Sequence, residues 1–276
     1  MKEGNKVAII GCGYVGEALA RSLSSKGFLV TCTVKTVRNI DHLNPFCQKV
    51  YYTTGEEASN IRAIIQENDV IIVTLAAKNR EDYRNTYLKT AETFRSLGKV
   101  PAGKHLIYTS STSVYGHHSG KWVDEDSPLL GETENVKILI ETENAYLSLT
   151  NMGWKVTIFR LAEIYGPKRT LRSKIESLEG RVLGGDGANY SNMIHQSDIT
   201  GALEYALSHP LEGIYNLADD DHFLRKDLYR ILAEKYHTKH VLFDPNIQKI
   251  RGDNKRISNR KIKSAGYAFT HPHRQF

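Results

Sequence analysis

Short apolar runs rich in β-branched residues recur along the first 160 residues, and segments with helical periodicity separate them. The runs lack the polar alternation of a half-exposed sheet, so we predict strands that are buried on both faces. These strands are Val7–Ile10, Phe28–Val34, Val70–Leu75, His105–Tyr108 and Lys155–Phe159, and the predicted helices are Tyr14–Ser25, Ala58–Gln66, Tyr83–Leu97 and Asn135–Leu149. This alternation predicts an α/β fold with a doubly wound parallel sheet, the Rossmann fold.

The pattern becomes looser after residue 166, where Gly166 and Pro167 interrupt it. Helices are expected at Asp198–Leu207 and Lys226–Lys235, and Asp198 is a suitable N-cap residue for the first of them. We therefore expect a Rossmann domain over residues 1–165. Residues 166–276 are expected to form a smaller C-terminal substrate lobe, with late segments returning to the sheet.

Composition narrows the class of protein. Hydrophobic residues make up 40% of the 276 residues, enough for a core, and the longest apolar run, Val70–Ala77, is far shorter than the about 20 residues that a membrane span needs. The N-terminal apolar segment turns into glycines after four residues, unlike a secretory leader, so we expect a cytoplasmic protein. The three cysteines, Cys12, Cys32 and Cys47, lack C-x-x-C spacing and are expected to be free thiols.

The net charge of +6 is a local feature, because residues 249–263 hold seven basic side chains and one acidic one. The segment lacks interleaved aromatic residues and a nucleic-acid motif, so we expect no nucleic-acid partner. Two interpretations of this basic segment remain open: it forms a solvated helix face, or it helps to bind an anionic substrate.

The string Gly11-Cys12-Gly13-Tyr14-Val15-Gly16 follows a predicted strand and opens a predicted helix. That context is what the dinucleotide-binding G-x-G-x-x-G fingerprint requires. Gly11 would permit the tight turn, Gly13 would let a pyrophosphate approach the backbone, and Gly16 would allow close contact between helix and strand. The free N–H groups at the helix N-terminus would face the phosphates.

The end of the second strand distinguishes NAD from NADP, because an acidic residue there binds the ribose 2′-hydroxyl and a basic one suits a 2′-phosphate. Here the first acid is Asp41, whereas Lys35 and Arg38 come earlier. We therefore expect NADP, with Lys35 as first candidate and Arg38 as second. NAD stays open, because the alternative interpretation is that both cations are solvated loop residues.

Several further segments, in order, resemble the extended and atypical short-chain dehydrogenase/reductases of the NAD-dependent epimerase/dehydratase type. They are residues 69–77 (DVIIVTLAA), 108–116 (YTSSTSVYG), 159–167 (FRLAEIYGP), 192–198 (NMIHQSD), 213–219 (GIYNLAD) and the tail from Arg256. With the glycine loop they cover nearly the whole chain.

The resemblance implies roles for particular residues. Leu75, Ala76, Ala77 and Tyr165 would lie against the cofactor, beside the loop residues Tyr14 and Val15. Ser111 would occupy the position of the catalytic hydroxyl, which can hydrogen-bond a substrate oxygen that gains or loses a proton. A simple turn of small hydroxyl residues is the other interpretation of residues 110–113.

The sequence departs from the family at the Tyr-x-x-x-Lys pair that transfers the proton and holds the nicotinamide ribose. Aligned with the family, Asn135 stands where tyrosine belongs and Leu139 where lysine belongs, and none of the 15 tyrosines has lysine four residues later. Three explanations remain open. Tyr115 or His195 acts as a substitute acid/base, the reaction needs hydride transfer alone, or the chain binds the cofactor as a sensor without turnover.

The substrate side is expected around Lys168 and Arg169, which could hold a diphosphate or carboxylate. The resemblance places Asn192 and His195 at the rim of the active site. A small anionic metabolite such as a nucleotide-sugar is the expected substrate, and a homodimer is left open. The histidines show no spacing typical of metal ligands, so we assign no metal.

Overall fold

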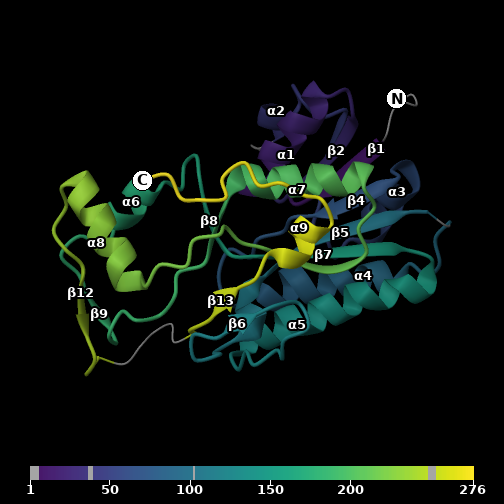
Figure 1. The fold of residues 1–276 in the computed structure, drawn as a ribbon. Coiled ribbons are helices and arrows are strands. Elements are labelled where there is room, and N and C mark those ends of the chain that lie inside the picture. The colour runs from purple at the N-terminus through teal and green to yellow at the C-terminus, as the bar shows by residue number, and fades with distance from the viewer. Residues whose placement is uncertain (1–5, 37–39, 102, 248–252) are drawn as a thin grey trace. The chain divides into compact units, whose positions relative to one another are not determined.

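The computed structural model describes residues 6–36, 40–101, 103–247 and 253–276 (Figure 1). The chain divides into two compact units, each assembled from separate stretches of sequence. The first, here called the sheet unit, comprises Met1–Ser111, Glu132–Arg160 and Thr200–Tyr215. The second, here called the small unit, comprises Thr112–Gly131, Leu161–Ile199 and Asn216–Phe276.

The described residues contain one seven-stranded sheet with strand order β11-β7-β5-β4-β1-β2-β3. Its strands are β1 (Lys6–Ile10), β2 (Leu29–Val34), β3 (Lys49–Tyr52), β4 (Val70–Val73), β5 (His105–Ser111), β7 (Lys155–Leu161) and β11 (Gly213–Leu217). The pairs β1–β2, β1–β4, β2–β3 and β4–β5 are parallel. From β1 the chain builds outward to β3 and then resumes at β4 on the other side of β1. The predicted doubly wound α/β fold is thus confirmed.

Helices cover both faces of this sheet because its strands are apolar on both sides. One face carries α3 (Ala58–Glu67), α4 (Lys89–Ser96) and α5 (Glu134–Leu147), whose buried side chains pack with alternate strand residues such as Ala8 and Leu106. On the opposite face, Ile9 approaches α1 (Tyr14–Ser25). The later part of α7 (Gln196–Ser208) also belongs to the sheet unit, where Glu204 pairs with Lys26.

Three elements of the sheet unit are irregular or short. The helix expected over Tyr83–Leu97 is divided into a π-helical turn, η2 (Arg84–Leu88), followed by α4. A short helix, α2 (Ile40–Leu43), precedes β3, and a 3₁₀ turn, η4 (Ser148–Met152), follows α5. None of the helices in the described ranges has the length and apolar character that crossing a bilayer would need.

The small unit is built from short elements around its own apolar cluster, which includes Tyr165, Met193 and Leu232. Its strands pair two by two: β10 (Met193–His195) with β8 (Glu163–Tyr165), β12 (Leu242–Asp244) with β9 (Val182–Gly184), and β13 (Arg256–Ile257) with β6 (Trp122–Val123). Its helices are η3 (Thr112–Tyr115), α6 (Leu171–Glu176), α8 (Arg225–Tyr236) and α9 (Arg260–Ser264).

Candidate functional site

The glycine loop between β1 and α1 is held by hydrogen bonds from both neighbouring strands. Gly11 has a φ of +95°, the left-handed conformation that its predicted tight turn requires. Its backbone N–H donates to Thr33 Oγ1 at 2.9 Å, and its carbonyl oxygen accepts a 2.9 Å bond from Thr74 Oγ1. Cys12 N–H donates to the carbonyl oxygen of Thr33. The loop is therefore fixed at the carboxyl ends of β2 and β4.

The other two glycines differ in what surrounds them. A Cβ at Gly16 would lie 2.6 Å from the Gly11 carbonyl oxygen and 2.7 Å from Thr74 Oγ1, so the predicted close approach of helix and strand is confirmed. A Cβ at Gly13 would meet nothing within 4 Å. Gly13 is the N-cap of the 12-residue helix α1, and no side chain caps it. The exposed helix start can therefore accept an anion.

A small hollow adjoins this loop where the strand order reverses. It is lined by residues from the carboxyl ends of β1, β2, β3 and β4 and from η2, among them Gly11, Lys35, Thr53, Leu75 and Thr86. Leu75 closes one side, because a Cβ on Gly11 would come within 2.9 Å of Leu75 Cδ2. Ala76 and Ala77 follow, and Ala77 N–H is bonded to the Tyr87 hydroxyl at 3.1 Å. Ligands of doubly wound sheets bind at such a reversal.

Lys35 brings a positive charge to the hollow. It directly follows β2, its side chain is exposed, and its Nζ donates to Thr86 Oγ1 at 3.4 Å. Glu56 is the acidic residue of the hollow's lining. The second predicted cation, Arg38, lies outside the described residues.

Two neighbouring serines end β5 and point to opposite faces of the sheet, as successive strand residues do. Ser110 Oγ donates to Glu143 Oε1 on α5 at 2.6 Å, and Arg160 Nη2 donates to Glu143 Oε2 at 2.7 Å. Both charged side chains are only 2% exposed. This buried network, which the sequence did not reveal, fixes the strand end that carries Ser111.

On α5, the two positions where the family's Tyr-x-x-x-Lys pair is expected carry other residues. Leu139 is buried in the sheet unit, whereas Asn135 is half-buried in the first turn of α5. Neither side chain has a titratable group. The aligned positions therefore provide no acid or base from α5.

Tyr115 and Asn192, two predicted site residues of the small unit, are engaged in internal hydrogen bonds. The Tyr115 side chain is fully buried, and its hydroxyl donates to Asn216 Oδ1 at 2.7 Å. Asn192 donates to the carbonyl oxygen of Lys255, and its Oδ1 accepts the Ile257 N–H and bonds to His222. Both side chains therefore form hydrogen bonds within the small unit.

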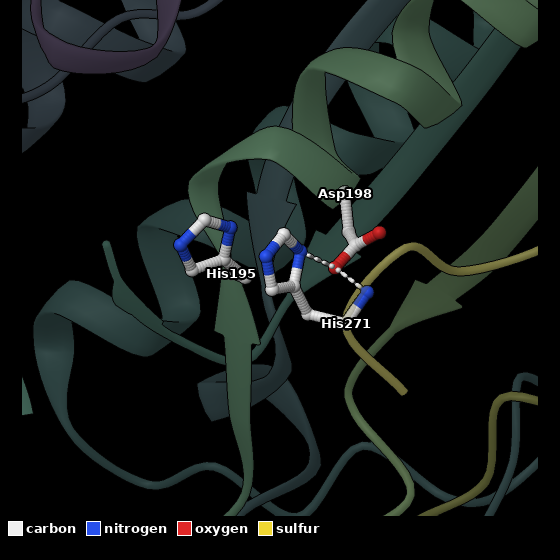
Figure 2. A group of neighbouring side chains, drawn as sticks. All are labelled: His195, Asp198 and His271. Carbon is white, nitrogen blue, oxygen red and sulfur yellow. Dashed lines mark hydrogen bonds and ion pairs between the residues drawn. The ribbon is translucent and has the colours of Figure 1, made fainter. Parts of the chain in front are cut away.

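His195 belongs to a compact group at the start of α7 (Figure 2). Its ring stacks on His271 with centroids 3.9 Å apart, and Ser197 Oγ lies 2.7 Å from His195 Nδ1 and 3.0 Å from His271 Nδ1. Burial lowers the pKa of His195, an effect that the neighbouring His271 increases. His195 is therefore a neutral imidazole near pH 7, able to accept or relay a proton.

Asp198 completes this group, but in a different role from the one predicted. It lies inside α7, which begins at Gln196, so the prediction that it caps the helix is wrong. Its fully buried carboxylate instead accepts the backbone N–H groups of Thr270 and His271 at 2.6 and 3.0 Å. One ligand atom from each of His195, Asp198 and His271 lies within 4.8 Å of the others, a spacing that could hold a metal ion.

The remaining predicted residues lie on β8 and the turn after it. Tyr165 is buried, its ring meets the His195 ring edge-on, and its hydroxyl has no hydrogen-bond partner among the described residues. Burial raises the pKa of Tyr165, so the hydroxyl stays protonated and can donate to a ligand. Lys168 and Arg169 are exposed on the turn that begins at Gly166, and Lys168 adopts a positive φ of 64°.

Comparison with known proteins places this geometry in context. Residues 7–218 match the NAD dependent epimerase/dehydratase family. The chain is 29% identical to Protein YeeZ of Escherichia coli K12 over 280 residues, covering 97% of this chain and 96% of that protein.

Two solved structures share the fold. UDP-glucose 4-epimerase of Thermotoga maritima with UDP-glucose has a TM-score of 0.78 and 18% identity, covering 95% of this chain and 93% of that one. The dTDP-glucose 4,6-dehydratase of Bacillus anthracis in complex with NAD also has a TM-score of 0.78 and 18% identity, with coverages of 94% and 89%.

Proposed function

The chain belongs to the NAD dependent epimerase/dehydratase family, and from this premise we propose that its glycine loop binds NADP or NADPH. The observation that carries the proposal is the loop itself. Gly16 leaves no room for a side chain, whereas the space at Gly13 lies open beside the uncapped start of α1. A pyrophosphate fits this arrangement, since the helix N-terminus offers backbone donors and a partial positive charge.

The preference for NADP rests on Lys35. Its ammonium lies at the hollow beside the glycine loop, and a ribose 2′-phosphate there would gain a charged partner. Thr33 and Thr86 add hydroxyl groups to the same lining. Glu56 favours NAD, because its carboxylate would repel a 2′-phosphate and could accept a ribose hydroxyl. We place Lys35 nearer the phosphate because it directly follows β2, the position that distinguishes the two cofactors.

We propose that the chain is an oxidoreductase or epimerase that uses this cofactor. When bound, the cofactor supplies hydride exchange at a carbinol or carbonyl carbon of the substrate. Ser111 would hydrogen-bond the substrate oxygen at that carbon, and the buried Ser110–Glu143–Arg160 network would keep its strand end in place. His195 is the candidate proton carrier, because Tyr115 is fully buried against Asn216.

A nucleotide-sugar, or another small anionic metabolite, is the proposed substrate class. The Thermotoga maritima and Bacillus anthracis enzymes that share the fold act, by their names, on nucleotide-linked glucose. The exposed cations Lys168 and Arg169 could pair with a diphosphate or carboxylate. The buried Tyr165 hydroxyl, which has no partner within the described ranges, could donate to the ligand.

A second function, a cofactor-binding sensor without turnover, is favoured by one observation. The two positions where the family has its tyrosine and lysine hold Asn135 and the buried Leu139. A phenol with a pKa of about 10 needs a neighbouring cation to act as a base at neutral pH, and these two positions of α5 provide neither group.

Substitution of Ser111 separates the two functions. The full chain, loaded with NADP or NADPH, is offered UDP-glucose, UDP-glucuronic acid and dTDP-glucose, and cofactor absorbance and sugar products are followed. If the chain is an enzyme, we expect it to turn over one of these sugars. Ser111→Ala should then lower the turnover about 100-fold and leave the cofactor affinity unchanged. The matched control is Ser127→Ala, whose hydroxyl bonds to Asp124 in the small unit. Cofactor binding without turnover of any sugar favours the sensor.

A further inference from the structure

The sulfur atom of Cys32 lies next to those of two other cysteines, one of which belongs to the glycine loop. Cys12 Sγ is 2.8 Å from Cys32 Sγ, and Cys47 Sγ is 2.9 Å from the same central sulfur. Cys12 belongs to the loop, Cys32 to β2 and Cys47 to the segment that leads into β3. All three belong to the sheet unit. Their spacing in the sequence gave no sign of this arrangement.

The distances favour sulfur exchange over a structural metal. Zinc–sulfur bonds of 2.3 Å at tetrahedral angles would hold the sulfurs about 3.8 Å apart. The observed separations are shorter than that, but longer than the about 2.05 Å of a disulfide bond. Cys32 therefore has two possible disulfide partners, and whichever sulfur is not bonded to it remains its neighbour.

The three cysteines differ in exposure and in pKa, and these differences indicate which sulfur an oxidant reaches first. Cys32 is fully buried, Cys12 is 9% exposed, and Cys47 is the half-buried member that a small reagent can reach. The hydrogen bond with Cys32 lowers the pKa of Cys47, whereas hydrogen bonds with both neighbours and burial raise the pKa of Cys32. The lowered pKa favours the thiolate at Cys47, and the raised pKa favours the thiol at Cys32.

We propose that Cys47, Cys32 and Cys12 form a site of thiol oxidation by hydroperoxides, and that a disulfide between Cys12 and Cys32 weakens binding at the glycine loop. The site itself stands on the sulfur geometry alone. Its effect on binding rests on the proposed function, because that effect requires the loop to hold a dinucleotide.

The chemistry begins at Cys47. Its thiolate attacks one peroxide oxygen, the O–O bond breaks, and Cys47 becomes a sulfenic acid while water leaves after protonation of the second oxygen. Cys32 sulfur then attacks Cys47 sulfur. The S–S bond forms, the S–O bond breaks, and the hydroxyl leaves as water with the Cys32 proton. Two thiols and one hydrogen peroxide thus yield one disulfide and two waters.

Exchange then moves the disulfide toward the loop. Cys12 sulfur attacks Cys32 sulfur, so that a Cys12–Cys32 bond forms and the Cys32–Cys47 bond breaks. Cys47 leaves as a thiolate and takes up the proton that Cys12 released. The site then holds a disulfide on one side and a free thiol on the other.

A bond at Cys12 affects the loop because this residue stands between Gly11 and Gly13. The loop is already fixed to Thr33 by the backbone N–H of Cys12 and to Thr74 by the Gly11 carbonyl oxygen. Shortening the sulfur separation from 2.8 Å to a covalent bond draws Cys12 toward β2 and displaces the N–H groups that face the phosphates. We expect an affinity loss of about tenfold, reversed by reduction.

The first test maps the disulfide without any cofactor. The full chain is reduced, treated with hydrogen peroxide, alkylated with N-ethylmaleimide and analysed by peptide mass spectrometry. The expected result is one alkylated cysteine per chain, with Cys32 in every disulfide, and three alkylated cysteines after dithiothreitol. Three alkylated cysteines after peroxide treatment would overturn the proposal, as would a disulfide between different chains.

Single variants then test the order of events. Cys47→Ser should oxidise at least tenfold more slowly. Cys32→Ser should form no disulfide and should accumulate sulfenic acid at Cys47, detected with dimedone. In Cys12→Ser the Cys32–Cys47 disulfide should form, and the oxidised variant should bind NADPH as tightly as the same variant in its reduced form. Because the wild-type result does not depend on these variants, a variant that fails to fold leaves the test intact.

The binding consequence is measured separately by titrating reduced and oxidised wild-type chain with NADPH. If a disulfide forms and the reduced chain binds no dinucleotide, the proposed function fails and the thiol site stands. If both forms bind equally, the proposed effect on the loop is contradicted.

Discussion

The hydroxyl of Thr74 donates a 2.9 Å hydrogen bond to the carbonyl oxygen of Gly11, joining the segment after β4 to the loop after β1. These two strands are neighbours in the sheet although 59 residues of chain lie between them, and the strand order reverses there. The same carbonyl oxygen lies where a Cβ on Gly16 would have to fit. The hydrogen bond between Thr74 and Gly11 therefore helps to position the glycine loop, the start of α1 and the hollow beside them.

Two glycine variants should separate folding from binding. Gly16→Ala places a methyl group 2.6 Å from a backbone oxygen, and we expect a loss of about 1–3 kcal/mol in the free energy of unfolding together with weaker NADPH binding. Gly13→Ala meets no neighbour within 4 Å, so it should fold normally and lose NADPH affinity alone. Denaturant unfolding and calorimetric titration measure the two effects. Normal NADPH binding by Gly13→Ala would contradict the proposed pyrophosphate position.

The charge of Lys35 should select between the two dinucleotides. Lys35→Ala removes the ammonium from the hollow, and we expect NADPH affinity to fall about tenfold with little change for NADH. Lys49→Ala is the matched control, because it removes the same charge at the start of β3, whereas Lys35 follows the carboxyl end of the parallel strand β2. Equal losses for NADPH and NADH would remove the argument for NADP.

The buried pair of Glu143 and Arg160 should be costly to break. Glu143→Ala leaves an arginine that is 2% exposed without its carboxylate, and we expect a loss of about 3–5 kcal/mol in unfolding free energy. The control is Glu176→Ala, which breaks an exposed pair with Arg172 and should change stability by less than about 1 kcal/mol. Chemical denaturation compares them, and similar small effects would show that the network does not hold β5.

Stability should fall with acid through His105. Burial lowers the pKa of this residue to about 4, below its unfolded value of about 6.5, and its Nε2 is 2.8 Å from Thr157 Oγ1. The unfolded chain therefore binds more protons between these two pH values, so this contribution is complete above pH 6.5 and is lost as pH falls to about 4. The loss amounts to about 3 kcal/mol. His105→Gln should flatten the stability curve in that window, and an unchanged slope would contradict the assignment.

Local patterns in the sequence predicted the parts of the fold that local physics determines. The apolar runs and the glycine spacing identified β1, α1 and β2, because burial on both faces and a left-handed turn leave direct marks in the sequence. The strand β3 was missed because its four residues, Lys49–Tyr52, include a lysine and two tyrosines and are partly exposed. The π-helical turn before α4 has no signal in the 3.6-residue periodicity.

The side-chain networks could not be predicted for a different reason. Asp198 binds backbone groups of Thr270 and His271, more than 70 residues away, so its pattern alone looked like a helix cap. Cys12 and Cys32 likewise meet only because β1 and β2 are paired. Such contacts depend on the tertiary register, which a single sequence does not record. The positions of the glycine loop and Lys35 followed from local spacing, whereas the partners that hold them did not.

The central claim is that the glycine loop of the sheet unit binds a dinucleotide, and calorimetric titration of the reduced full chain tests it most directly. NADPH, NADP, NADH and NAD are titrated in turn under the same buffer conditions. We expect saturable binding of one dinucleotide per chain, tightest for the phosphorylated pair. Absence of binding for all four would contradict the account.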